Sequence, residues 1–306
     1  MPRETLRFSP AYVRRAKAFI THARSVRSAA RADPVDAGAL RILCYHRVGN
    51  EHDPLTVRVR RFRVQMNALA ERGFRVLDVR TAWRRLTAQR EAGAQTGERL
   101  IGLTFDDGYE DVAENALPVL EELGFSATVF VVTGAVDGHT RLTWYDRQPA
   151  LLDWTEIEDL DGNSPLSFEP HSRTHRNLLA LPDDVLRAEL SGSKATLESH
   201  VGRPARVFSY PGGLFGDRER RLVADAGFEV AVTCRPGTNN AGSDRLALNR
   251  TMVERSDHML DFLAKIRGGH DAELPLRAPY LRLRYGRAHR SRGRPLAPDL
   301  IGRFQS

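Results

Sequence analysis

The sequence predicts an α/β protein in which helices cover a mostly parallel sheet. Short apolar runs of strand length alternate with longer segments whose apolar residues recur at helical spacing. The run 126–133 (SATVFVVT) is apolar without alternation, which is typical of a strand buried on both faces. A chain of 306 residues is long enough for one large domain with a substantial core. A barrel and an open doubly wound sheet both fit this pattern.

The first predicted strand is 40–45 (LRILCY), and a helix follows at 59–72, where Gly73 ends it. Further strands are predicted at 74–79, 100–105, 126–133, 166–169, 206–210, 228–233 and 245–249. Further helices are predicted at 110–123, 183–200, 217–226 and 257–267. The region 134–165 lacks periodicity and is expected to form a long loop over one face. Its aromatic residues Trp144, Tyr145 and Trp154 could stack on a sugar or anchor the loop by packing.

Charge divides the chain into three parts. Residues 1–31 carry eight Lys or Arg against one Glu, and residues 277–294 carry seven Arg and no acid. The net charge is only +7, so the body between these ends is acidic. We therefore expect a basic N-terminal extension at 1–38, helical in character, a folded domain at 39–272 and a basic tail at 273–306.

The basic ends are either solvated or contact an anionic membrane surface. Nucleic acid is not an expected partner, because the acidic body would repel a duplex. Neither a secretory signal nor an apolar run of 18 residues occurs in the sequence. The expected location is the cytoplasm, where the basic ends could hold the protein at the inner face of the membrane.

Three polar segments each follow a predicted strand, where parallel α/β proteins place their active sites. In TFDDG (104–108) one carboxylate can bind a cation while its neighbour faces a substrate, although solvated acids in a turn are the alternative. In HSRTH (171–175) two histidines four apart can aim at one cation, although surface histidines also occur at this spacing. SYPGG (209–213) could present backbone N–H groups to an oxyanion, or form an ordinary turn.

Together these segments resemble the polysaccharide deacetylase family, whose members share the NodB homology domain. TFDDG and HSRTH match its first two motifs, and SYPGG matches its third loosely. The stretches 42–62 and 262–271 resemble the opening and closing segments of a branch associated with bacterial exopolysaccharide synthesis. The resemblance implies a distorted (β/α) barrel with about seven parallel strands and outer helices, whose catalytic domain spans 39–272.

The resemblance also implies the roles of the site residues. Asp107, His171 and His175 would bind one divalent metal ion, and Asp106 would be the general base. Zinc is the expected ion, although cobalt, nickel and iron suit the same ligands. The family's C-terminal histidine motif is missing here. In the exopolysaccharide branch a histidine at the end of the first strand takes the role of general acid, and here that residue is His46; a hydrogen-bonded strand-end histidine is the alternative.

The third motif departs from the family, because Ser209 stands where an arginine normally orients the base. Arg250, after the predicted strand 245–249, is the candidate to replace that arginine. Tyr210 and Gly212, with Arg250, are the candidates for oxyanion or substrate contacts.

The sequence therefore predicts a metal-dependent hydrolase that removes N-acetyl or similar acyl groups from an amino-sugar glycan, in exopolysaccharide synthesis. Two alternatives remain open at this point. One is a deacylase of a lipid-linked sugar or small amide at the membrane surface. The other is a non-catalytic carbohydrate-binding relative.

Overall fold

The structure is a computed structural model that describes residues 38–91, 98–269 and 271. The predictions for the basic extension and the basic tail fall on residues outside these ranges. The described residues enclose one main hydrophobic core, which lies between the central strands and the helices that surround them. Within the described part of the chain, no helix is both long and apolar enough to cross a membrane.

The central sheet is built around the long strand β5 (Arg99–Asp107). Strand β1 (Leu40–Tyr45) pairs with one edge of β5 in parallel. The other edge pairs with β4 (Phe74–Leu77) near its start and with β6 (Ala127–Val131) near its end. Strand β7 (Leu166–Pro170) continues the parallel sheet beyond β6. Every residue of β1 and β6 is buried, as expected for strands covered on both faces.

The remaining strands curve the sheet into a distorted barrel. Strand β11 (Thr251–Met252) pairs with β1 in parallel and β10 (Thr238–Asn239) pairs with it in antiparallel orientation. Strands β8 (Val207–Ser209) and β9 (Val230–Val232) form a separate parallel ladder beside β7. A single bridge between Val232 and Leu248 links this ladder to the segment that leads into β11. A small outer ladder joins β2 (Arg47–Val48) to β3 (Thr56–Val57).

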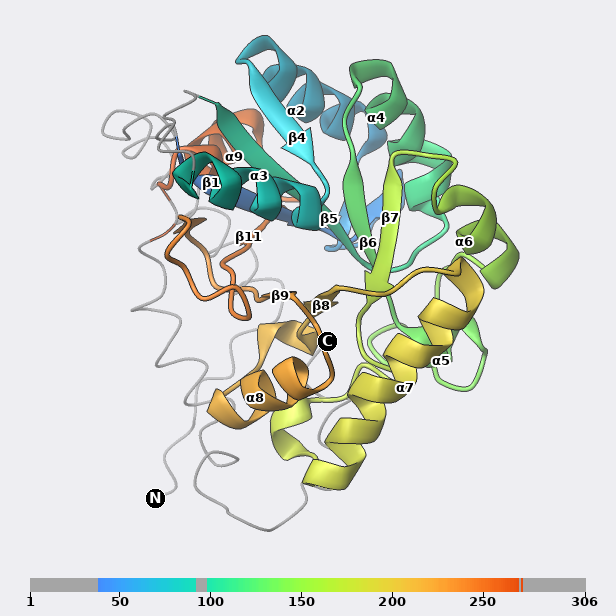
Figure 1. Cartoon of the computed structure of the whole chain (residues 1–306). Helices are drawn as coiled ribbons and strands as arrows, with labels where there is room; N and C mark the ends of the chain where they lie inside the picture. Colours follow the sequence, from blue (N-terminus) through green and yellow to red (C-terminus); the bar gives the residue numbers. More distant parts are fainter. Residues whose placement is uncertain (1–37, 92–97, 270, 272–306) are drawn as a thin grey trace, which may run out of the picture.

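Helices surround the strands. Figure 1 shows α2 beside α4, and α7 and α8 contact each other on another part of the molecule. Their bounds are α2 Val59–Glu71, α3 Val79–Glu91, α4 Leu117–Leu123, α5 Thr133–Val136, α6 Trp154–Leu160, α7 Asp183–Val201, α8 Asp217–Asp225 and α9 Met259–Ile266. Shorter turns are η1 Val112–Ala116, η2 Leu178–Ala180 and η3 Pro211–Gly213. Helix α2 buries Phe62, Met66 and Leu69, the face expected from their spacing.

The parallel α/β prediction is confirmed, although the short strands β2, β3, β10 and β11 were not predicted and other elements differ locally. Helix α3 was not predicted, and the expected loop at 134–165 contains α6 and most of α5. The strand predicted at 245–249 is wrong, because only Leu248 forms a bridge there. The side chain of Asp244 accepts the N–H of Leu246 and its carbonyl accepts the N–H of Ala247, so a turn takes the place of strand geometry.

The seam between β7 and β8 is closed by a side chain. Glu169, which is buried in β7, accepts the backbone N–H groups of Arg206 and Val207 through one carboxylate oxygen, at 2.8 and 2.9 Å. Its other oxygen accepts from Arg203 at 3.2 Å. Burial raises the pKa of Glu169 to about 7, although the two N–H donors and Arg203 oppose that shift. The Glu169 carboxylate therefore accepts the N–H groups that a backbone carbonyl of a neighbouring strand would otherwise accept.

Glu169→Ala should lower the free energy of unfolding by about 3 kcal/mol, because two buried N–H donors lose their acceptor. Glu169→Gln keeps one acceptor oxygen and should cost about 1 kcal/mol. The folded chain binds a proton at Glu169 more tightly than the unfolded chain, whose glutamates titrate near pH 4.3. The stability of the wild type relative to Glu169→Gln should therefore fall as the pH rises from about 5 to about 8. Chemical denaturation across that pH range measures the free energy of unfolding of each protein. Equal stabilities of the Ala and Gln variants would contradict the role of Glu169 as acceptor, and a pH-independent difference between wild type and Glu169→Gln would contradict the raised pKa.

Candidate active site

The predicted site residues come together at the carboxyl ends of the parallel strands. Asp106 and Asp107 are the last two residues of β5, and His171 directly follows β7. His175 lies four residues further along the same loop, and His46 directly follows β1. Parallel α/β proteins place catalytic groups at this edge, so the placement agrees with the sequence prediction.

Asp107, His171 and His175 form a group that could hold a metal ion. Their candidate ligand atoms all lie within 4.8 Å of one another. Asp107 Oδ1 is 3.8 Å from His171 Nε2 and 3.6 Å from His175 Nε2. This buried oxygen has no hydrogen-bond partner among the described residues, and an unsatisfied buried carboxylate oxygen is costly without a cation. Two imidazole nitrogens and one carboxylate oxygen are a donor set that zinc commonly takes, so these three residues would suit such an ion.

Hydrogen bonding sets the tautomer of His171. Its Nδ1 lies 2.8 Å from the carbonyl oxygen of Ser209 in the third motif, and a carbonyl can only accept. Nδ1 therefore carries the proton, and Nε2 offers its lone pair toward Asp107. Burial lowers the pKa of His171 to about 4, which keeps the ring neutral, the form that binds a metal. Burial and the neighbouring His171 also lower the pKa of His175 well below its ordinary value.

The backbone is strained around Asp107, His171 and His175, which we call the metal trio. Asp107, Ser172 and His175 have φ angles of 76°, 62° and 54°, and within the described residues they are the non-glycine positions with positive φ. Such conformations persist only where the surroundings hold them, and they cluster at functional sites. Glu189 of α7 supplies part of that hold, because its carboxylate accepts the N–H groups of Arg173 and Thr174 at 3.0 and 2.8 Å.

Arg250 reaches Asp106 from the segment before β11. Its guanidinium binds both carboxylate oxygens, with NH1 at 2.6 Å from Oδ1 and NH2 at 2.7 Å from Oδ2. Further bonds to the carbonyl of Thr233 and the hydroxyls of Thr104 and Ser209 fix its orientation. Burial raises the pKa of Asp106, but Arg250, together with His171 and His46, more than offsets it and holds the pKa well below its usual range. The contact that the third motif lacks is thus made by Arg250, with Ser209 beside it.

His46 lies close enough to Asp106, His171 and His175 to affect the pKa of each. Burial lowers the pKa of His46 itself, with Asp106 opposing the shift. The ring is therefore mostly neutral near pH 7, whereas a general acid must be protonated. His46 would therefore have to gain a proton before it could act as the general acid that the resemblance implies.

The third motif supplies fewer donors than predicted. The N–H of Tyr210 donates to the carbonyl of Val232 at 3.2 Å, and its hydroxyl donates to the carbonyl of Leu246 at 3.0 Å. Both donors are thus engaged inside the protein, and the predicted oxyanion or substrate contact from Tyr210 stays a prediction. Gly212 is exposed, with a φ of 60°, and its contact with an oxyanion stays a prediction.

Two residues beside the site were not predicted, Tyr109 and Glu189. The hydroxyl of Tyr109 donates to Asp107 Oδ2 at 3.1 Å. Glu189 could have been noticed, because it follows Leu186 by three positions on the buried face of α7. Tyr109 lies two residues from Asp107, but no sequence pattern shows that its side chain turns back toward that carboxylate.

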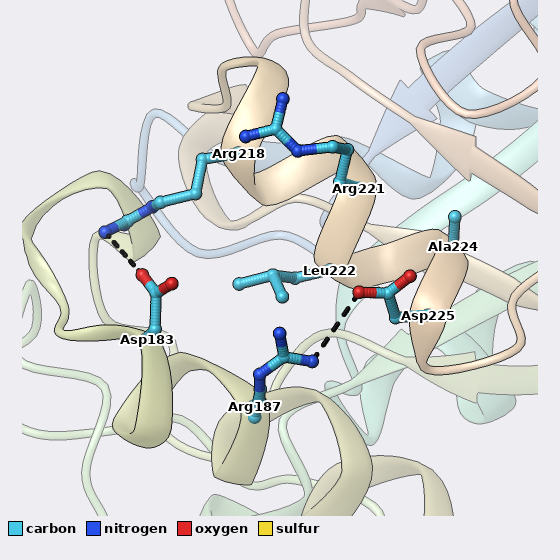
Figure 2. Close-up of a pocket in the computed structure, with 7 residues that line it drawn as sticks. All are labelled: Asp183, Arg187, Arg218, Arg221, Leu222, Ala224 and Asp225. Carbon is cyan, nitrogen blue, oxygen red and sulfur yellow. Dashed lines mark hydrogen bonds and ion pairs between the residues drawn. The ribbon is translucent and has the colours of Figure 1, made fainter.

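A separate pocket of about 240 Å³ lies between α7 and α8. Figure 2 shows its arginines and acids facing one another across Leu222, with Arg218 paired to Asp183 at 3.2 Å and Arg187 to Asp225 at 3.6 Å. Among the described residues, those that line it include none of the predicted site residues. The candidate catalytic residues therefore lie at the strand ends and not in this pocket.

Comparison with known proteins agrees with the site geometry. Residues 93–231 match the family described as polysaccharide deacetylase, a span that includes all three motifs. These residues carry the polysaccharide deacetylase domain that the motifs predict. His46 and Arg250 lie outside the matched span, so the match does not bear on their places in the site.

Among the polysaccharide deacetylase relatives, YxkH of Bacillus subtilis (strain 168) is 26% identical over 214 residues, covering 70% of this chain and 71% of that protein. The poly-β-1,6-N-acetyl-D-glucosamine N-deacetylase of Staphylococcus aureus (strain MRSA252) is 23% identical over 176 residues. That match covers 55% of this chain and 58% of the staphylococcal enzyme, so it spans little more than half of the relative.

Solved structures share the fold. The deacetylase PplD of Streptococcus pyogenes superposes with a TM-score of 0.65 at 22% identity, covering 76% of this chain and 99% of PplD. IcaB of Ammonifex degensii also gives a TM-score of 0.65, at 23% identity, covering 77% of this chain and all of IcaB (100%). The predicted distorted barrel of the polysaccharide deacetylase type is confirmed.

Proposed function

We propose that this protein is a metal-dependent hydrolase that removes N-acetyl groups from an amino-sugar glycan. The observation that carries the proposal is the convergence of Asp107, His171 and His175, with one buried carboxylate oxygen left without a hydrogen-bond partner among the described residues. A second carboxylate, Asp106, lies directly beside this trio with its Oδ2 at 3.8 Å from His171 Nε2. A cation-binding group next to a charged carboxylate is an arrangement that can hydrolyse an amide.

The donor set fits a divalent cation such as zinc, because it combines two neutral imidazoles with one carboxylate and leaves coordination positions open. A bound cation would polarise the attacking water and the substrate carbonyl. Asp106 would accept the proton of that water through Oδ1, which keeps a lone pair beyond the one bound by Arg250, whereas Oδ2 also accepts the Cys44 thiol at 3.5 Å. Arg250 would keep Asp106 charged and fixed in orientation.

His46 would deliver a proton to the leaving amine. The His46 ring is mostly neutral at rest, so it must take up a proton before it can donate one. The proton that Asp106 removes from the attacking water would supply it. The exposed N–H of Gly212 is the candidate in the third motif to contact the oxyanion, now that Tyr210 is engaged elsewhere.

The substrate class follows from the relatives. The staphylococcal protein acts, by its name, on poly-β-1,6-N-acetyl-D-glucosamine. We therefore propose an N-acetylated hexosamine polymer of bacterial exopolysaccharide as the substrate of this chain.

The experiment measures acetate released from β-1,6-linked N-acetylglucosamine oligomers by the full chain. Zinc-loaded protein should release acetate, the chelated protein should not, and zinc or cobalt should restore the activity. His171→Ala should neither retain stoichiometric zinc after dialysis nor release acetate. His200→Ala is the matched control, because His200 stacks on Trp154 and pairs with Glu158 instead of Asp107.

Three outcomes would contradict the proposal. Full activity in the chelated protein, or stoichiometric zinc in His171→Ala, would show that the trio is not a catalytic metal site. Zinc binding without acetate release from any amino-sugar oligomer would instead favour a non-catalytic carbohydrate-binding relative.

A further inference from the structure

The two oxygens of Asp107 have different surroundings. Oδ1 faces His171 and His175, whereas Oδ2 accepts the hydroxyl of Tyr109 at 3.1 Å. The indole Nε1 of Trp144 lies 3.3 Å from that same hydroxyl. An indole nitrogen can only donate, so the direction of this chain of bonds is fixed. Trp144 donates to Tyr109, and Tyr109 donates to Asp107.

Trp144 also contacts a second member of the trio. Its ring centroid lies 4.6 Å from that of His175, with 56° between the planes. His175 has a positive φ, and its backbone N–H donates to the hydroxyl of Ser172 at 3.0 Å. The Trp144 ring thus limits the rotation of the His175 side chain, while the indole N–H acts on Asp107 through Tyr109. The Trp144 side chain therefore acts on two of the three candidate metal ligands, His175 directly and Asp107 through Tyr109.

The loop that carries Trp144 is fixed to the backbone next to Asp107. The N–H of Leu152 donates to the carbonyl of Gly108 at 3.0 Å, and the N–H of Glu110 donates to the carbonyl of Ala150 at 3.1 Å. Tyr109 and Leu151 form an antiparallel bridge between these bonds. The loop therefore moves with the strand end that carries Asp107.

The packing around Trp144 is separate from the main core. Tyr109, Val132, Ala135 and Leu142 form a small buried cluster against which Trp144, Tyr145 and Leu151 pack. We call it the loop cluster. Because it shares no buried residue with the main core, changes within it should affect the site more than they affect folding.

We propose that Trp144 and Tyr109 are positioning residues that set the metal affinity of this chain, Trp144 by holding Asp107 through Tyr109 and His175 through its ring. Hydrogen-bond partners of metal ligands orient them, and their loss commonly costs tenfold to a hundredfold in affinity. The loop 137–152 is thereby assigned the part of a support for the metal trio. The inference rests on the metal site of the proposed function.

The test measures the zinc dissociation constant by chelator competition and the visible spectrum of the cobalt-loaded protein, both without substrate. Tyr109→Phe removes the hydrogen bond to Asp107 together with the one from Trp144, whereas Trp144→Phe removes only the latter. Both variants keep a ring, and each should weaken zinc binding by about tenfold. The double variant should bind like Tyr109→Phe alone, because this part of the Trp144 effect passes through Tyr109. Trp144→Ala also loses the ring contact with His175, so it should bind more weakly than Trp144→Phe and alter the cobalt spectrum.

Trp154→Phe is the matched control, since the Trp154 indole donates to Asp137 at 2.7 Å and its ring stacks on His200. Its zinc affinity should equal that of the wild type. A dissociation constant within twofold of the wild type in both Tyr109→Phe and Trp144→Phe would overturn the inference, and so would additive effects in the double variant. Because these measurements need no substrate, an inactive protein that shows them would contradict the proposed reaction and leave the inference standing.

Discussion

Replacing Asp106 with asparagine is expected to lower kcat for acetate release by about a hundredfold or more. Asparagine has nearly the same shape, but its amide cannot accept the proton of the attacking water. Zinc affinity should change little, because Asp107, His171 and His175 supply the ligand atoms. A loss of kcat with unchanged zinc affinity would distinguish Asp106, the proton acceptor, from Asp107, the metal ligand. The sequence alone cannot distinguish the roles of two adjacent aspartates.

The control for Asp106→Asn is Asp161→Asn. Asp161 also binds an arginine through both oxygens, at 2.8 and 2.6 Å from Arg203, and it contacts none of the metal trio. Asp106→Asn leaves Arg250 without its counter-charge, whereas in Asp161→Asn Arg203 loses one of two acidic partners and keeps Glu169. Both variants should lose stability, so circular dichroism must first show that each is folded at the assay temperature. Only Asp106→Asn should lose kcat. A kcat within tenfold of the wild type in folded Asp106→Asn would assign the proton transfer to another group.

Much of the site could be predicted because its residues follow buried strands whose apolar runs are plain in the sequence. Asp107 and His171 are placed by the ends of β5 and β7, and their motifs fix their spacing to neighbours. Helix α3 was also within reach, because Val79, Ala82, Trp83 and Leu86 recur at helical spacing. Helix α6 was not, since in a helix of seven residues only Ile157 is buried.

The rest depends on contacts between distant parts of the chain. Arg250 binds Asp106 across 144 positions, and Trp144 reaches Tyr109 across 35. No periodicity records such a contact, because it depends on how the strands curve and where the loop is fixed. The failed strand at 245–249 has a local cause in the side chain of Asp244, which competes with the ladder for backbone N–H groups.

Replacing Arg250 with methionine is expected to lower kcat/KM near pH 7 by about tenfold or more and to destabilise the fold by about 3 kcal/mol or more. Arg250 is fully buried, and its two bonds to Asp106 offset the cost of burying that carboxylate. Without the guanidinium, burial would raise the pKa of Asp106. The proton acceptor would then be neutral in part of the molecules at neutral pH, and its charged fraction would grow as the pH rises.

The pH profile of Arg250→Met decides between two roles for this arginine. If Arg250 orients Asp106 and keeps it charged, the acid limb of kcat/KM moves to higher pH, and activity partly recovers in alkaline buffer. Arg250→Lys keeps the charge but not the paired bonds, so its acid limb should shift less while its kcat still falls. Arg203→Met, which breaks the comparable pair with Asp161, should lose stability without moving the limb. A uniform loss at every pH in Arg250→Met would point instead to a direct contact between Arg250 and the substrate oxyanion, since losing that contact would not change the protonation of Asp106.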